Sequence, residues 1–276
     1  MLLAVAVISA ALPSYGQNSP YPAEPDVPNG WIEAPGSKAN PGLWECAGYG
    51  GSQIVRLEQG SVRMGKPPDD EPEQVQLPQQ LKLSKEMHGS RSLLRTAGGW
   101  LVGFDAGEFG GGLWWFNNKG DKNQKLLPEN VHAIYHTRDG VFVLVGLAHL
   151  SLDGGEIYQF SETAEEVRVT LVADLGSSPE ASTVDSAGRF IIATPKSVVA
   201  ADSAGSLHEL YKSGEDLTYP TSVVVDPNGS IFVGMRFFVL RLVPADNGHY
   251  RPQWLMERDC QSFKIVERIC TCGDTQ

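Results

Sequence analysis

The sequence predicts an all-β fold, a β-propeller built from four-stranded antiparallel blades. No segment has a sustained 3.6-residue apolar period, whereas two-residue alternation and β-branched runs recur throughout the chain. A third observation is an internal repeat of about 40 residues, a length typical of one propeller blade. Five blades account for the repeats, and six is the alternative count. A β-sandwich or a β-helix would be the other ways to use such strands.

The repeat is anchored by four glycines, Gly99, Gly140, Gly188 and Gly229, which are spaced 41, 48 and 41 residues apart. Each follows a polar turn between two apolar strands, as in VVVDPNGSIFVG around the last anchor. Asp caps the backbone in such turns, and Gly takes the left-handed conformation. A break, a third strand, a second polar turn and a final strand then complete each unit.

Both ends of the repeat region are expected to contribute further strands. A fifth, less regular unit fits residues 42–83, with WECAGYG, QIVRLEQ and VQLPQQLKL as its expected strands. The FKIV segment within residues 261–272 is expected to close the ring against this unit. Residues 42–272 would then form a single propeller domain.

The residues before this domain are expected to direct export and to act as a spacer. Residues 1–16 fit a signal peptide, because an uncharged apolar run, Leu2–Pro13, precedes small residues at the cleavage position. The run is shorter than the ~20 residues that span a bilayer. A buried N-terminal segment is the alternative. Residues 17–41 are rich in Pro and predict an extended linker without regular elements. A periplasmic or secreted location follows.

Cysteines stand at both ends of the expected domain. The four residues are Cys46, Cys260, Cys270 and Cys272. In an exported protein they predict disulfides, with three possible pairings. A bond from Cys46 to the tail would join the two ends and stabilise the fold by about 5 kcal/mol in the chain-entropy model. A metal site is the alternative, although the Cys-x-Cys spacing lacks the paired Cys-x-x-Cys pattern of structural zinc.

The segment PTSVVVDPNGSIFVG, residues 220–234, resembles the NHL, SMP-30 and gluconolactonase-like propeller superfamily, and residues 181–194 are a weaker copy. The resemblance covers roughly residues 90–255 and implies a propeller. It also implies, for lactonases of that group, a metal held by Glu, Asn and Asp side chains at the top of the channel. Glu180 lies in a segment similar to the one that supplies their Glu. No segment matches those supplying the Asn and Asp ligands. Residues 104–116 resemble secreted bacterial proteins without an assigned function.

The repeat register predicts which polar residues converge. In a propeller, the loop between the second and third strands opens on the same face as the link between blades. Residues at these positions form a candidate ligand site: Glu108, His149, Glu180 and Arg236, with Tyr219 and Lys196 beside them and His132 at a similar phase. Arg binds carboxylate or phosphate, whereas Glu and His bind metals or move protons. Solvated turn residues without a role are the alternative interpretation.

Charge and motifs then narrow the function. The formal net charge of −11 argues against nucleic acid and anionic membranes as partners. The sequence contains no nucleophile elbow, phosphate-binding loop or dinucleotide fingerprint. We therefore expect a non-enzymatic exported protein that binds a small molecule or a protein, without a cofactor and without a transmembrane span in its mature form. The alternative is a metal-dependent, lactonase-like hydrolase in which Glu180 is the candidate metal ligand.

Overall fold

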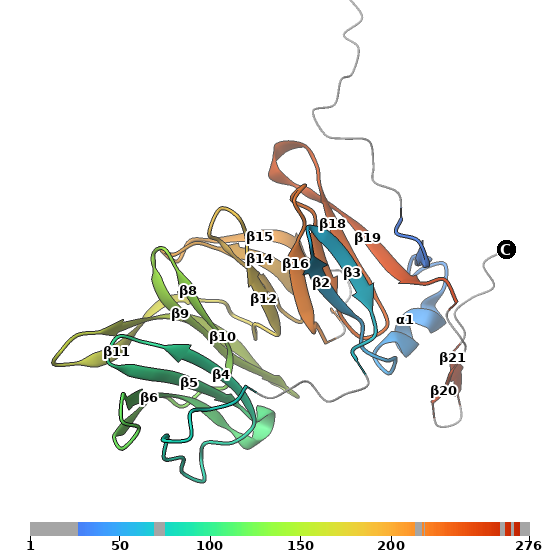
Figure 1. Ribbon diagram of the computed structural model, residues 1–276. Coiled ribbons are helices and arrows are strands. Elements are labelled where there is room, and N and C mark those ends of the chain that lie inside the picture. The colour runs from blue at the N-terminus through green and yellow to red at the C-terminus, as the bar shows by residue number, and fades with distance from the viewer. Residues whose placement is uncertain are drawn as a thin grey trace, which may run out of the picture.

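The computed structural model describes residues 27–68, 75–212, 217, 219–259, 263–265 and 268–270. In this part of the chain, four sheets of four or five antiparallel strands succeed one another along an arc (Figure 1). Consecutive strands are neighbours within each sheet, as in a meander. These sheets are blades of a β-propeller, as the repeat predicts. The leader expected at residues 1–16 lies outside the described residues.

The first two blades are regular four-stranded meanders. The first blade comprises β4 (Ser90–Arg95), β5 (Gly99–Asp105), β6 (Gly111–Asn117) and β7 (Asn123–Leu127), with the 3-10 turn η1 (Gly107–Phe109) between β5 and β6. The second blade has longer strands, β8 (Val131–Thr137), β9 (Gly140–His149), β10 (Leu152–Glu162) and β11 (Val167–Asp174).

The third and fourth blades match the two clearest sequence repeats. The third comprises β12 (Ala181–Val184), β13 (Phe190–Ala193), β14 (Ser197–Ala201) and β15 (Leu207–Lys212). The fourth comprises β16 (Ser222–Val225), β17 (Ile231–Gly234), β18 (Val239–Pro244) and β19 (Tyr250–Glu257), with the 3-10 turn η2 (Asp246–Gly248) between β18 and β19. Each anchor glycine lies between the first and second strands of its blade or begins the second strand.

In the anchor turns, an Asp side chain caps the backbone and a Gly takes the left-handed conformation, as the sequence predicts. In the fourth blade, the Asp226 Oδ1 atom accepts hydrogen bonds of 2.8 Å from the backbone N–H groups of Asn228 and Ser230. Gly229 has a φ of +82°, a conformation that L side chains rarely adopt. The turn therefore ends β16 and starts β17 at fixed positions.

Neighbouring blades are held together by apolar side chains that alternate along each strand. In β9, Val143 packs in a cluster with Leu101 of the first blade, whereas Phe142 and Leu144 pack in a cluster with Phe190 of the third. None of these five side chains has more than 1% of its surface exposed. Because strand residues alternate between faces, one strand can fill the interfaces on both of its sides. Burial between blades thus replaces a single central core.

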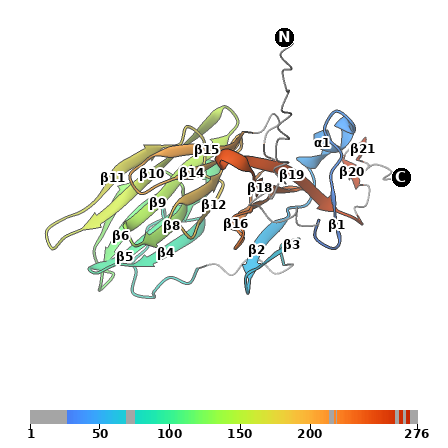
Figure 2. The ribbon, with the colours of Figure 1, turned by 90° about the horizontal axis from the view of Figure 1, so that it is seen from above.

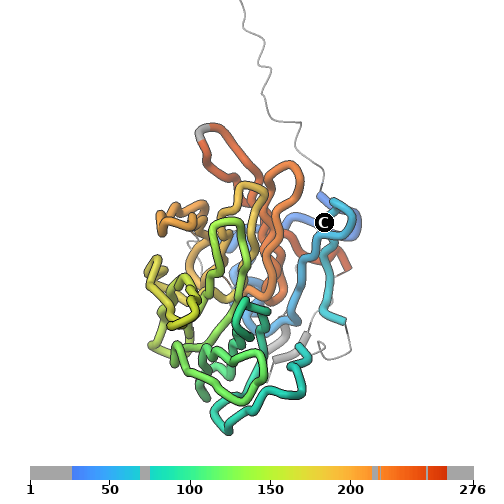
Figure 3. Tube along the Cα trace, turned by 60° about the vertical axis from the view of Figure 1, so that its left-hand side comes forward, coloured from blue at the N-terminus to red at the C-terminus, as the bar shows by residue number. Residues whose placement is uncertain are grey.

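The fifth unit is less complete than the sequence predicts. Hairpin β2 (Ile54–Glu58) and β3 (Ser61–Gly65) supplies two strands, and β2 contacts β16 of the fourth blade, so that segments far apart in sequence lie side by side (Figure 3). The strand expected at WECAGYG is wrong, because Pro41–Ala47 forms the helix α1. Asn40 caps this helix by accepting a 3.1 Å hydrogen bond from the Leu43 N–H. VQLPQQLKL contains no strand among its described residues.

The two ends of the domain meet differently from the expectation. The segment FKIV contributes β20 (Phe263–Ile265), which pairs with β21 (Arg268–Cys270) and not with a strand of the unit at residues 42–83. Within the Pro-rich segment, where no regular element is expected, β1 (Trp31–Glu33) pairs with the outer edge of β19. Trp31 is buried there, which explains why this part of the segment is ordered onto the sheet.

Helix α1 carries Cys46 and contacts β21, which carries Cys270 (Figure 2). Cys46 is buried and is not a free thiol. Cys260 and Cys272 lie outside the described residues. Which cysteines pair with one another therefore stays a prediction. Among the described residues, no helix is both long and apolar enough to cross a membrane.

Candidate functional site

The loops between the second and third strands of the blades form one face of the molecule, here called the loop face. On the first blade, this loop is η1, which carries Glu108. Buried Asn130 fixes η1, because its Nδ2 atom donates to the Gly107 carbonyl at 2.9 Å and its Oδ1 atom accepts from the Ala106 N–H at 3.2 Å. Glu108 is therefore presented on a held backbone.

His149 ends β9 and contacts the neighbouring blade. Its Nε2 atom lies 2.8 Å from the Glu108 Oε2 atom, and the two side chains are 38% and 46% exposed. The repeat register predicts equivalent positions for these residues, and the structure brings them into direct contact. The pair is a hydrogen bond in either charge state of the imidazole, provided that Nε2 carries a proton.

Beside this pair lies a pocket of about 440 Å³, here called the loop-face pocket. Four of the six candidate ligand residues line it: His149, Glu180, Lys196 and Tyr219. The remaining wall is mostly apolar and consists of Ala148, Leu150, Ser151, Leu152, Asp153, Pro195 and Leu217. Its volume lies within the range of about 300–1,000 Å³ that small-molecule sites occupy.

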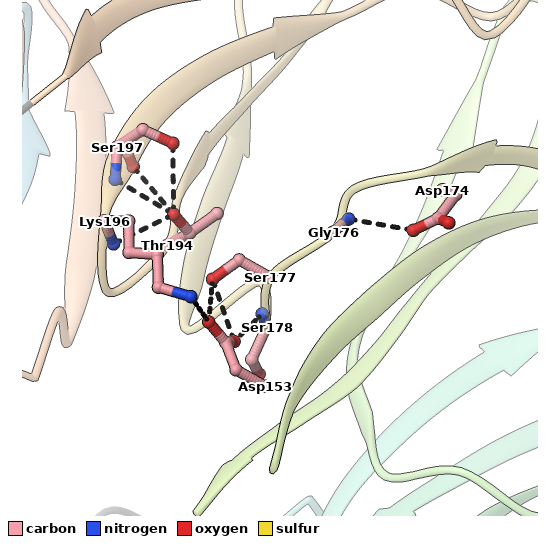
Figure 4. A network of polar contacts seen from close by, with 8 residues as sticks. All are labelled: Asp153, Asp174, Gly176, Ser177, Ser178, Thr194, Lys196 and Ser197. Atoms are coloured by element: carbon pink, nitrogen blue, oxygen red, sulfur yellow. Dashed lines mark hydrogen bonds and ion pairs between the residues drawn. The ribbon is translucent and has the colours of Figure 1, made fainter. Parts of the chain in front are cut away.

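Lys196 is held in this pocket by Asp153. The Lys196 Nζ atom lies 2.6 Å from the Asp153 Oδ2 atom (Figure 4). The same carboxylate accepts hydrogen bonds from the Ser177 hydroxyl at 2.8 Å and from the Ser178 N–H at 2.9 Å. Burial alone would raise the pKa of Asp153, but the bonds from Lys196 and the two serines outweigh burial and lower its pKa. Asp153 is therefore a carboxylate that ties the second blade to the third.

Tyr219 and Arg236 form the third contact on this face. The guanidinium carbon of Arg236 lies 3.8 Å from the centroid of the Tyr219 ring, and its Nη1 atom donates to the Gly48 carbonyl at 2.7 Å. Tyr219 is 59% exposed. The Arg236 side chain is not among those lining the loop-face pocket, and it reaches the site through Tyr219.

Backbone strain is concentrated on the same face. Among the described non-glycine residues, four have positive φ, and three of them lie here: Leu150 at +54°, Tyr219 at +51° and Phe237 at +67°. Such conformations each cost on the order of 1–3 kcal/mol and are common at ligand sites. Leu150 and Tyr219 line the loop-face pocket, so the strain falls where a ligand would touch the protein.

Glu108 lines a second cavity of about 690 Å³, which borders both strands of the β9–β10 hairpin and shares Leu152 and Asp153 with the first. Its charged side chains are acidic: Glu108, Glu129, Asp153, Glu156 and Asp174. Burial and a 3.1 Å hydrogen bond to Glu156 raise the pKa of the neighbouring Tyr158 to about 12. The Tyr158 hydroxyl therefore donates a hydrogen bond to the Glu156 carboxylate and stays protonated to a higher pH than an ordinary tyrosine.

Sequence reasoning missed Asp153, Ser177 and Ser178. Asp153 precedes two glycines at the start of a third strand, a pattern that resembles an ordinary hairpin turn. The one available signal is Gly155, where an added Cβ would lie 2.5 Å from the Ser177 carbonyl oxygen. A glycine is needed at position 155 because the link between the second and third blades passes so close to it. Only the folded structure shows which segment forms that link.

His132, which the register places near the site, lies inside the blade interface. Its Nδ1 atom lies 3.6 Å from the Asp105 Oδ2 atom, and its Nε2 atom lies 3.2 Å from the Ser178 hydroxyl. The order Asp, His, Ser is that of a hydrolytic triad. However, Ser178 has no exposed surface, and Nε2 also lies 3.1 Å from the Gly146 carbonyl. A substrate cannot reach this serine, so the array joins blades.

The residues near Glu180 do not fit the metal that the lactonase resemblance implies. A metal of that kind needs several carboxylate, amide or imidazole ligands around one point. Among the described residues, no three His, Cys, Asp or Glu side chains are grouped so as to hold a metal ion.

Comparisons with known proteins concern the architecture. No protein-family model matches the chain, and no curated protein matches it. Solved structures do match, among them a gluconolactonase of Xanthomonas campestris, with 13% identity, a TM-score of 0.39, and coverage of 64% of this chain and 59% of that chain. Less than two thirds of the gluconolactonase therefore has a counterpart here. The likeness is one of fold.

Two further structures illustrate the range of matches. A virginiamycin B lyase from Staphylococcus aureus is 10% identical over 80% of this chain and 72% of that chain, with a TM-score of 0.40. A protein from Lactobacillus plantarum is 15% identical over 76% and 64%, with a TM-score of 0.44. A gluconolactonase, the kind of propeller that the sequence resembles, is thus among the matches. At these identities the likeness says nothing about activity.

Proposed function

We propose that this chain is an exported, non-enzymatic binding protein whose ligand occupies the loop-face pocket. One observation carries the proposal: three successive parts of the arc of blades supply the pocket wall. The β9–β10 turn supplies one side, the loop at Lys196 the second, and the link at Tyr219 the third. A ligand there would contact the second and third blades and the link to the fourth.

The side chains of the pocket support recognition. Lys196 is paired with Asp153, His149 with Glu108, and Tyr219 lies against Arg236. Groups already held by partners are oriented before a ligand arrives, which lowers the entropic cost of binding. The array around His132, which resembles a hydrolytic triad, does not line this pocket, and its Ser178 is buried behind Asp153. These features support a binding site with fixed polar groups.

Blocking the pocket tests the proposal. Ala148 lines the pocket, and Ala148→Trp would fill it, whereas Ala204→Trp places the same bulk on an exposed turn between β14 and β15. Crystals of the wild type soaked with a fragment set are expected to show fragments in the loop-face pocket. The Ala148→Trp variant should lose them and the Ala204→Trp variant should keep them. Fragments that bind only elsewhere, or that persist beside Trp at 148, would contradict the proposal.

The export part of the proposal rests on the leader sequence and has its own test. Expression of the full chain in a bacterial host, followed by fractionation and N-terminal sequencing, is expected to give mature protein beginning near Gln17. Intact Met1 on cytoplasmic protein would contradict export. That result would not bear on ligand binding in the pocket, so export and binding are tested independently.

A further inference from the structure

In the described part of the chain, one charged group of the loop-face pocket has no partner. Lys196 is neutralised by Asp153 at 2.6 Å, and His149 is bonded to Glu108. Glu180 also lines the pocket and is half-buried, yet its carboxylate has no hydrogen-bond or ion-pair partner among the described residues. The Glu180 oxygens are not among the buried atoms that lack a partner, so they face the open pocket and are free to accept a hydrogen bond from a ligand there.

Most charged side chains near Glu180 are also negative. Five carboxylates line the adjacent acidic cavity, which shares Asp153 with the loop-face pocket. Among the described residues lining the two cavities, Lys196 is the only Lys or Arg, and it is already paired. Clefts lined by charges of one sign concentrate ligands of the opposite sign. A cation is therefore favoured here over an anion.

The apolar side chains of the pocket wall favour a ligand with an apolar part. Leu150 is 94% exposed, Leu152 is 62% exposed and Tyr219 is 59% exposed, which is unusual for large apolar side chains around one pocket. The left-handed backbone at Leu150 and Tyr219 holds both at this position against local strain. Covering these side chains with an apolar ligand would contribute about 25 cal/mol per Å² removed from water.

We infer that the ligand is a small organic ammonium ion with an apolar body. Its nitrogen would donate to the Glu180 carboxylate, and its apolar part would lie against Leu150, Leu152 and Tyr219. This inference rests on the proposed function, because it names the ligand class of the same pocket. It assigns Glu180 a role as a charge-recognising residue and not as a metal ligand.

Three compounds of similar shape and different charge test the ligand class. Binding of 2-phenylethylammonium, 2-phenylethanol and 3-phenylpropanoate to the full-length protein would be measured by NMR titration at neutral pH. We expect the ammonium ion to bind about tenfold more tightly than the alcohol, in line with a charged hydrogen bond. The carboxylate should bind most weakly. Added salt should reduce the preference for the ammonium ion, because it screens the acidic field.

Two matched variants assign the preference to one residue. Glu180→Gln keeps the shape of the side chain and removes its charge, so it should abolish the preference for the ammonium ion. Glu165→Gln, on the exposed turn between β10 and β11, should retain it. The same titrations on Ala148→Trp show whether the compounds enter the pocket at all.

The outcomes separate the ligand class from the pocket. Equal binding of ammonium and alcohol, unaffected by Glu180→Gln but abolished by Ala148→Trp, would overturn the ligand class and leave the pocket as the site. Equal affinities of wild type and Ala148→Trp for all three compounds would overturn the pocket itself. Failure of all three compounds to bind the wild type would overturn the inference of an ammonium ligand.

Discussion

The Nε2 atom of His149 lies 2.8 Å from the Oε2 atom of Glu108, and this contact joins the loop faces of two adjacent blades. Both side chains are more than one third exposed, so water screens the pair. Its role is therefore orientation: Glu108 fixes one edge of the imidazole ring, while His149 lines the loop-face pocket. Stability and binding should respond differently when the pair is broken.

A double-mutant cycle separates these two effects. With Glu108→Gln, His149→Gln and the double variant, we expect a coupling free energy of unfolding of about 0.2–1 kcal/mol, as for exposed ion pairs. Denaturation in urea at low and high salt measures it, and salt should reduce it. A coupling of several kcal/mol would show that the contact is a structural bridge and would contradict a role in orientation.

Asp153 should affect stability far more, because it is largely buried and holds three donors. Asp153→Asn is expected to lower the free energy of unfolding at neutral pH by about 1–3 kcal/mol, since the donors Ser177 and Ser178 lose a charged acceptor, whereas the exposed Lys196 ammonium contributes little. Asp246→Asn, on the exposed turn η2, is a control that should change stability little. Equal stability of Asp153→Asn and wild type would contradict the assigned network.

The lowered pKa of Asp153 predicts that the protein loses stability as the pH falls. The folded protein lowers the pKa of Asp153 below its ordinary value of 3.8, so the unfolded chain takes up the proton first. The stabilisation is therefore present above pH 3.8 and is lost as the pH falls through the lowered pKa. Acid unfolding of wild type and Asp153→Asn measures it, and the difference between them should shrink below this pH.

Two adjacent glycines in β10 provide a matched test of the blade interface. A Cβ at Gly155 would lie 2.5 Å from the Ser177 carbonyl oxygen and 2.6 Å from the Pro179 Cδ atom, whereas a Cβ at Gly154 would meet nothing within 4 Å. Gly155→Ala should cost about 1–3 kcal/mol through overpacking. Gly154→Ala should be nearly neutral. Thermal unfolding compares them, and similar melting temperatures would contradict the packing of this link.

The ends of the domain predict a covalent link. Helix α1 contacts β21, so we expect Cys46 to be bonded to Cys270 in oxidised protein. Peptide mapping without reductant should recover the linked peptides, and reduction should lower stability by about 2–4 kcal/mol. Cys46→Ser should show the lower stability with or without reductant. A linkage of Cys46 to Cys260 or Cys272 would contradict this pairing but keep the ends joined.

The sequence predicted the blades where each one repeats local chemistry. The Asp-capped turn at Gly229 depends only on residues within the turn, so its strands could be placed from the sequence. Residues 42–83 lacked such a turn, and there the expected strands were wrong in part. The cap from Asn40 to Leu43 is short-range, but the apolar pattern of this region suited strand and helix equally.

In the candidate site, too, some residues could be predicted from the sequence and others could not. Register along the repeat predicted Glu108, His149, Glu180 and Lys196 on one face, because loops at equivalent positions of a propeller open together. It did not identify Asp153, whose partners Ser177, Ser178 and Lys196 are 24 to 43 residues away in sequence. Side-chain contacts between residues so far apart in sequence depend on how one blade packs against the next.

The sequence by itself determined the class of fold, the anchor turns and the face on which polar residues gather. These follow from period-two apolar patterns and from turns whose hydrogen bonds are local. Only the tertiary structure decided that Lys196 is neutralised by Asp153, while the Glu180 carboxylate in the same pocket has no partner among the residues that the structure describes. Charge balance in a pocket depends on distances between blades, and burial of apolar side chains between blades sets those distances.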